Sequence, residues 1–148
     1  AHVKLLEDKP GVIYDWSADV MNRNWNPAKA KKKLKELPDM LVCDALLDQE
    51  LFAGVGNIIK NEVLFRIKVH PESRVGALPV KQLNALVKEA RLYSFDFLEW
   101  KKNGELKEHW QAYSRKICPS CNIKLHKSNT GKSERRSFYC NNCQLLYA

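Results

Sequence analysis

The sequence predicts a mainly α-helical fold that ends in a small β-hairpin module. Apolar residues recur at helical spacing along one long segment, residues 80–100. Shorter amphipathic segments with helix start and stop signals precede it. The C-terminal segment 114–148 instead holds two C-x-x-C pairs and the alternating stretch RRSFYC, which is typical of a strand.

The first helix is expected to follow an irregular N-terminal segment. Residues 1–26 have little periodicity and are interpreted as a linker or the remnant of a preceding domain. Asn26 is a suitable N-cap and Pro27 suits the first helical position. A lysine-rich helix is therefore predicted from Pro27 to about Leu37, and Pro38 ends it.

Three further helices are predicted downstream. Asp39 can cap a helix whose apolar stripe extends to about Phe52. A second helix follows the turn AGVGN and covers residues 58–67, and the long helix covers residues 80–100 after a loop at 70–79.

The turn AGVGN has a chemical reading as well as a structural one. Gly54 and Gly56 leave backbone N–H groups exposed, and the helix that starts just after them points the positive end of its dipole outward. This arrangement favours phosphate binding, to which the amide of Asn57 could donate. The alternative is a plain helix–helix turn in which Asn57 is the N-cap.

The two cysteine pairs indicate a metal site. Their separation is typical of a four-cysteine zinc site, in which four thiolates complete the tetrahedral shell. The predicted ligands of one structural zinc ion are Cys118, Cys121, Cys140 and Cys143. Two disulfides are the alternative, but no signal-peptide pattern is present. His126 is expected to be solvent-exposed, and Cys43 to be a small apolar residue of a helix.

The charge distribution favours a polyanionic partner. The chain carries 25 Lys and Arg against 17 Asp and Glu, a net charge of +8. Residues 113–148 contain seven basic residues and one acidic residue. Nucleic acid is therefore the predicted partner. No apolar run approaches the length of about 20 residues that spans a bilayer. No basic amphipathic helix with an aromatic face accompanies the charge either, so no membrane partner is expected. The lysine run at 29–35 is either part of this basic surface or a solvated helix face.

Two ordered motifs carry a resemblance to a known family. The stretch LLDQELFAGVGNIIKNEVLFRIKVHPES, followed by a long helix and a four-cysteine finger with RRSFYC, resembles the formamidopyrimidine-DNA glycosylase / endonuclease VIII family from about Leu46 to Gln144. The resemblance implies a helix-two-turn-helix DNA-binding bundle at 27–113 and a zinc finger at 114–148. It implies that Asn57, with Gly54 and Gly56, contacts a backbone phosphate near the damaged nucleotide.

The same resemblance assigns a role to the finger. Arg135 is implied to hold a phosphate at the lesion. Arg136, which stands where the family usually has a small residue, is the alternative candidate for this contact. A hairpin fixed by zinc would present an arginine for bidentate phosphate contact at a low cost in conformational entropy. Glu62, Asp48 and Glu50 are expected to have structural roles.

Catalysis is not expected from this chain alone. Members of the family use an N-terminal proline and a neighbouring glutamate, whereas this sequence begins AHVKLL. We therefore interpret it as the C-terminal DNA-binding part of a larger bifunctional DNA glycosylase/AP lyase that acts on oxidised bases. The short segment 101–116 favours the endonuclease VIII side of the family. No catalytic residue is assigned.

The expected partners follow from this interpretation. They are double-stranded DNA with a damaged base or an abasic site, and the N-terminal catalytic domain of the same protein. The protein is expected to be a monomer in the cytoplasm, associated with the nucleoid and not secreted. A non-enzymatic zinc-ribbon protein that binds nucleic acid is one alternative, and a zinc ribbon that binds acidic proteins is another.

Overall fold

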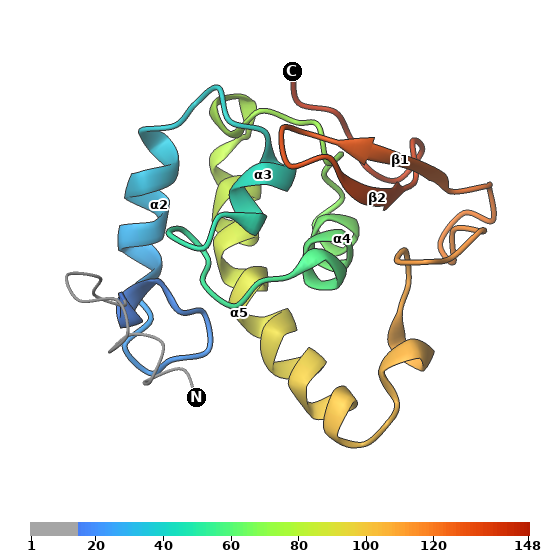
Figure 1. The fold of residues 1–148 in the computed structure, drawn as a ribbon. Coiled ribbons are helices and arrows are strands. Elements are labelled where there is room, and N and C mark those ends of the chain that lie inside the picture. The colour runs from blue at the N-terminus through green and yellow to red at the C-terminus, as the bar shows by residue number, and fades with distance from the viewer. Residues whose placement is uncertain (1–14) are drawn as a thin grey trace.

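The helices of the chain pack around one long helix, and a β-hairpin covers one side of them (Figure 1). A computed structural model describes residues 15–148. The helices are α2 (Pro27–Lys35), α3 (Val42–Leu47), α4 (Asn57–Arg66) and α5 (Val80–Lys102), with short 3₁₀ segments η1 (Trp16–Ala18), η2 (Val75–Ala77) and η3 (Leu106–His109). Strands β1 (His126–Thr130) and β2 (Arg135–Tyr139) form the hairpin.

The predicted limits of α2, α4 and α5 are confirmed to within two residues. The side chain of Asn26 accepts a hydrogen bond from the N–H of Lys29 at 3.1 Å, which is the predicted N-cap of α2. The apolar stripe of α5 faces the core, where Leu86, Ala90 and Tyr93 are fully or almost fully buried. α4 packs against this stripe, and its side chains Val63 and Leu64 are buried as expected.

The second predicted helix is wrong at both ends. α3 begins at Val42 without a side-chain cap, because the carboxylate of Asp39 pairs with Arg74 at 3.2 Å instead. The helix ends at Leu47 and does not reach Phe52. The side chain of Asp48 accepts the N–H of Glu50 at 2.9 Å and so stabilises a turn, which competes with helix continuation.

The part of the expected linker that the structure describes packs against the bundle. Val20 is fully buried. The guanidinium of Arg91, on α5, donates to the carbonyl groups of Val20 at 3.2 Å and Asn22 at 2.9 Å. Residues 15–26 are therefore packed with the helical bundle, whereas the rest of the segment lies outside the described residues.

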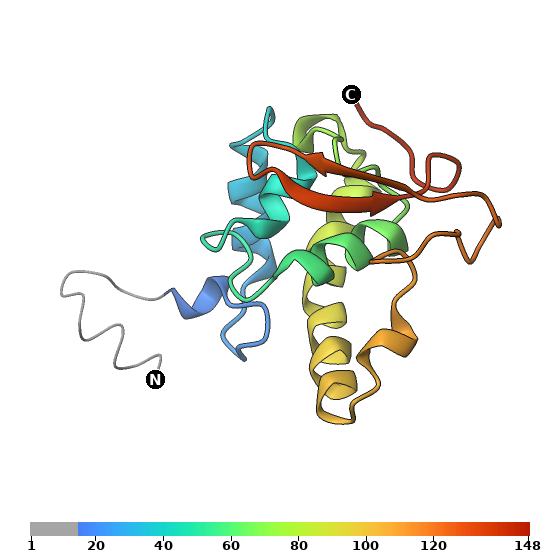
Figure 2. The same ribbon diagram turned by 45° about the vertical axis from the view of Figure 1, so that its right-hand side comes forward.

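The C-terminal module has a small core of its own. The hairpin is antiparallel, with His126 opposite Tyr139 and Thr130 opposite Arg135. Both views place it over α3 and α4, with its turn beside α3 (Figures 1 and 2). Its core consists of Phe65, Ala112, Cys118, Leu125 and Cys140, so α4 contributes Phe65 to it. Within residues 15–148, no helix is long and apolar enough to cross a membrane.

Candidate nucleic-acid interface

The glycine turn is organised by a side chain that the sequence analysis did not single out. Gln49 accepts the N–H of Gly54 at 2.9 Å and donates to the carbonyl of Val55 at 3.1 Å. Gly54 has a φ of +98°, which residues with a side chain rarely adopt. The turn therefore needs glycine at this position, and Gln49 sets the direction in which the chain enters α4.

The N-terminus of α4 is open. Gly56 occupies the N-cap position in extended conformation, and no side chain caps the helix. Asn57 is the first helical residue, so the alternative in which it caps the helix is wrong. A helix start without a side-chain acceptor presents unpaired N–H groups and a positive dipole end, which together suit an anion.

The side chain of Asn57 bonds to the hairpin. Its amide nitrogen donates to the carbonyl of Arg136 at 3.0 Å. The same carbonyl accepts from Asn61 at 3.1 Å and from the ammonium group of Lys60 at 3.2 Å. Asn61 also accepts the N–H of Phe138 at 2.7 Å. The free edge of β2 is therefore fixed to α4, and the glycine turn and the zinc hairpin form one unit.

Lys60 is an unusual component of this junction because it is fully buried. Its ammonium group donates to the hydroxyl of Ser137 at 2.7 Å, and that hydroxyl lies 2.6 Å from the hydroxyl of Thr130. Burial disfavours the charged form and lowers the pKa of Lys60 to about 8. Sequence reasoning missed Lys60 and Asn61. The available signal was a run of three polar residues, Lys60, Asn61 and Glu62, between apolar residues of the same helix.

The turn of the hairpin rests on α3. The carboxylate of Asp44 accepts the N–H groups of Lys132 at 3.0 Å and Ser133 at 3.1 Å, and the hydroxyl of Ser133 at 2.8 Å. Gly131 has a φ of +73°, and a Cβ there would lie 2.4 Å from a carboxylate oxygen of Asp44. Asp44 therefore holds the turn that leads directly into Arg135.

The two predicted phosphate-binding arginines point to opposite faces of the hairpin. Arg135 lies opposite Thr130, whose side chain belongs to the buried face, whereas Arg136 lies opposite the exposed Asn129. Successive side chains of a strand alternate between its two faces. Both arginines are exposed, and neither forms an ion pair within residues 15–148. The structure places the side chain of Asn57 against the backbone carbonyl of Arg136.

The four predicted ligands form a zinc site. Their sulfur atoms lie within 4.8 Å of one another, and all four cysteines are free, so the disulfide alternative is wrong. Cys118 and Cys143 are 3.7 Å apart at sulfur, and Cys121 and Cys140 are 3.5 Å apart. Zinc–sulfur bonds of about 2.3 Å in a tetrahedron place sulfurs about 3.8 Å apart, so the thiolates fit this ion. With four protein ligands the ion is structural.

The two residues that were expected to lie outside the metal shell do so. His126 is exposed and stacks on Tyr139, with ring centroids 5.6 Å apart. Cys43 is fully buried on α3, as predicted.

Two further contacts attach the zinc module to the bundle. The side chain of Gln144 accepts the N–H of Cys140 at 2.8 Å and donates to the carbonyl of Val69 at 3.0 Å. The buried carboxylate of Glu62 accepts the N–H groups of residues 111, 112 and 113 at 2.8, 2.8 and 2.7 Å. Glu62 therefore has a structural role, as predicted, because it orients the segment that enters the finger.

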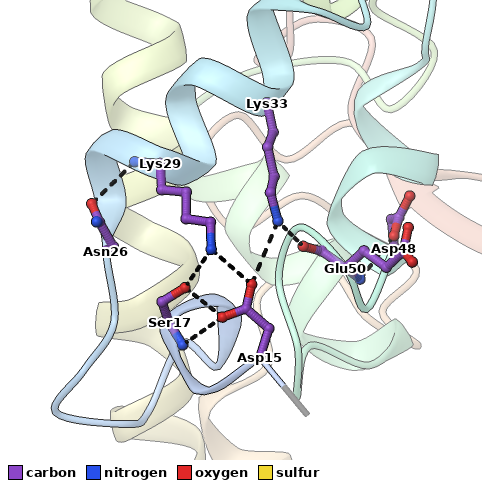
Figure 3. A network of polar contacts seen from close by, with 7 residues as sticks. All are labelled: Asp15, Ser17, Asn26, Lys29, Lys33, Asp48 and Glu50. Carbon is purple, nitrogen blue, oxygen red and sulfur yellow. Dashed lines mark hydrogen bonds and ion pairs between the residues drawn. The ribbon is translucent and has the colours of Figure 1, made fainter. Parts of the chain in front are cut away.

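Part of the lysine run at 29–35 serves the fold. Lys29 pairs with Asp15 at 3.0 Å and donates to the hydroxyl of Ser17, while Lys33 donates to the carbonyl of Glu50 at 3.1 Å (Figure 3). Hydrogen bonds from Ser17 and Lys29 hold the pKa of Asp15 well below its usual range. Lys33 also lies 3.7 Å from the carboxylate of Asp15, so both lysines tie the N-terminal described residues to α2.

Comparison with known proteins identifies relatives of this arrangement. The family described as "Formamidopyrimidine-DNA glycosylase H2TH domain" matches residues 17–93. Endonuclease 8-like 3 of Xenopus laevis is 35% identical over 127 residues, which cover 85% of this chain and 21% of the relative. Endonuclease 8-like 2 of Bos taurus is 35% identical over 131 residues, which cover 86% of this chain and 39% of the relative. The chain thus spans well under half of these relatives.

Solved structures share the fold. A viral DNA glycosylase aligns with a TM-score of 0.77 at 23% identity, over 96% of this chain and 54% of that protein. A Lactococcus lactis formamidopyrimidine-DNA glycosylase, bound non-covalently to DNA that contains an AP site, aligns with a TM-score of 0.78 at 23% identity, over 97% and 53%. The arrangement of the helical bundle and the C-terminal hairpin therefore occurs in other proteins.

Proposed function

We propose a function from one premise: the chain belongs to the formamidopyrimidine-DNA glycosylase / endonuclease VIII family, whose helix-two-turn-helix domain matches residues 17–93. The chain is the DNA-binding C-terminal part of an endonuclease VIII-like DNA glycosylase/AP lyase that acts on oxidised bases in base-excision repair. Its ligand is double-stranded DNA with a damaged base or an abasic site.

One observation carries this proposal. The amide of Asn57, at the open start of α4, donates to the Arg136 carbonyl on the strand that also bears Arg135. The two motifs named by the family resemblance, although 79 residues apart in the sequence, are therefore in direct contact. We call Asn57, the N-terminus of α4 and Arg135 the phosphate clamp.

The chemistry of the phosphate clamp suits a DNA backbone. A primary amide has two N–H groups, so Asn57 can hold the hairpin with one and donate to a phosphate oxygen with the other. The unpaired N–H groups of the α4 terminus add neutral donors. Arg135 supplies a planar cation that forms two parallel hydrogen bonds to phosphate. These contacts position a backbone and read no sequence.

A salt titration of binding tests the proposal. Arg135→Ala should weaken binding to abasic-site duplex DNA and flatten the plot of log K against log salt by about one unit, because one phosphate contact is lost. Asn57→Ala should weaken binding without a change of slope, since Asn57 is uncharged. The hairpin stays in place in this variant because Lys60 and Asn61 still hold the Arg136 carbonyl.

Lys132→Ala is the matched control, since Lys132 lies in the same module and carries the same charge. It should have a smaller effect than Arg135→Ala. Equal effects of Arg135→Ala and Lys132→Ala, with none from Asn57→Ala, would indicate a generally adhesive basic tail and contradict the phosphate clamp.

The proposal extends to the rest of the protein. The curated relatives are far longer than this chain. We assign base removal to an N-terminal catalytic domain of the same protein and expect it to act as a monomer. The expected cytoplasmic, nucleoid-associated location stays a prediction.

A further inference from the structure

The zinc module has a basic groove that the phosphate clamp does not include. The groove has a volume of about 950 Å³ and is lined by residues 114–117, 124–127, Arg136 and Phe138. Its charged residues are all basic: Arg115, Lys116, Lys124, Lys127 and Arg136. We call this surface the outer groove, because Arg136 and Phe138 lie on the hairpin face opposite to that of Ser137, whose hydroxyl contacts Lys60 of α4.

Arg136 belongs to the outer groove and not to the phosphate clamp. It lies opposite Asn129, and Lys127 lies opposite Phe138, so all four side chains share the outer face of the hairpin. Arg135 shares the other face with Ser137, whose hydroxyl contacts Lys60. Arg136 therefore adds a cation on a face of the hairpin that the phosphate clamp does not include.

Backbone hydrogen bonds fix the chain segments that carry the basic residues of the outer groove. The N–H of Leu125 donates to the carbonyl of Lys116 at 2.8 Å, and Ile117 pairs with Lys124 in an antiparallel bridge. The zinc ligand Cys118 donates its N–H to the carbonyl of Ile123 at 2.8 Å. The first zinc knuckle therefore sets the positions of Lys116 and Lys124 relative to the hairpin.

The nucleic-acid strand that fits this surface is not the one held by the phosphate clamp. A single backbone that passes along one face of a two-stranded ribbon cannot reach side chains on the opposite face. In duplex DNA a second backbone runs across the groove, and a two-stranded β-ribbon is narrow enough to lie between the two.

We propose that Arg136 and Lys127 hold the complementary strand of the duplex while Arg135 holds the damaged strand. This inference rests on the proposed function. It makes the hairpin a bridge between the two backbones, with Lys116 and Lys124 extending the contact along the complementary strand. The exposed apolar side chain of Ile117 in the same groove can pack against a deoxyribose ring.

The experiment compares two DNA probes for the same variants. One probe is a duplex with an abasic-site analogue, and the other is the damaged strand alone. Arg136→Ala should lower duplex affinity about fivefold to tenfold at 0.1 M salt and reduce the salt slope by about one unit, while single-strand affinity stays within about twofold. Lys127→Ala should act in the same way. Arg135→Ala should weaken binding to both probes.

Lys88→Ala is the matched control, because Lys88 is an exposed lysine on α5, away from the hairpin. Zinc content and helical circular dichroism should be unchanged in Arg136→Ala, since its backbone carbonyl still meets its three donors on α4.

Each other outcome overturns the inference. Equal losses on both probes would place Arg136 on the damaged strand. No loss on the duplex would mean that the outer groove does not hold DNA, as expected if its partner were an acidic peptide. A different result would contradict the proposed function itself: Arg135→Ala would have no effect on binding to either probe.

Discussion

Lys60 should make the stability of the protein rise in mildly alkaline solution. Its ammonium group is fully buried between α4 and β2, and burial lowers its pKa from 10.5 to about 8. Below pH 8 the side chain is protonated in both the folded and the unfolded state, so it adds no pH dependence there. Between about pH 8 and pH 10.5 the unfolded state binds more protons, and the free energy of unfolding therefore increases with pH.

The size of this effect follows from the two pKa values. They differ by about 2.5, and one pKa unit corresponds to about 1.4 kcal/mol, so the full gain across the window is about 3 kcal/mol. Burial is the main cause of the lowered pKa of Lys60; the nearby charge of Arg135 lowers it further, whereas Cys43 and Asp44 raise it.

The assay is urea unfolding of the wild type and of Lys60→Met at pH 7, 8, 9 and 10. Methionine has a similar volume and no charge, so the difference between the two proteins isolates Lys60, and the other titrating groups cancel. The wild type should gain up to about 3 kcal/mol relative to the variant as the pH rises through this window. Lys81→Met is the control, since it makes the same replacement at an exposed lysine.

Two results would refute the reasoning. Parallel pH profiles of the wild type and Lys60→Met would mean that water reaches the ammonium group in the folded protein. A wild type that loses stability relative to the variant as the pH rises would mean that hydrogen bonding to the charged form outweighs its burial.

Three further predictions concern the attachment of the finger. One zinc per chain should be found by elemental analysis, and Cys121→Ser should lose it while helical circular dichroism is largely retained; a metal-free wild type would contradict the site. Asp44→Ala should speed hydrogen exchange at the N–H groups of Lys132 and Ser133, which lose their acceptor, and unchanged exchange would mean that Asp44 does not hold the turn. Glu62→Ala leaves three N–H groups without a partner and should lower the free energy of unfolding by about 3 kcal/mol at about 1 kcal/mol each; Glu62→Gln should lose less.

Local signals in the sequence predicted the elements well where those signals act over a few residues. The Asn26 cap and Pro27 define the start of α2, and helical spacing predicted α5, because caps and periodicity depend on neighbouring residues alone. The cysteine spacing predicted the zinc site for a similar reason, since each knuckle is a short turn with two thiolates. Prediction failed at Asp39, where a distant partner, Arg74, competes for the carboxylate.

The relation between the two DNA-binding motifs was decided by tertiary structure. The sequence indicated Asn57, Arg135 and Arg136 as candidate phosphate contacts. Because successive side chains of a strand point to opposite faces, the sequence alone also predicts that the two arginines lie on different faces. Which face turns towards α4 depends on Lys60 and Asn61 reaching residues more than 70 positions away. No local pattern encodes such a contact, because the folded chain supplies a polar partner for each buried donor only after α4 and β2 have packed together. The sequence thus indicated which residues are candidates for phosphate contact, and packing determined which face of the hairpin turns towards α4.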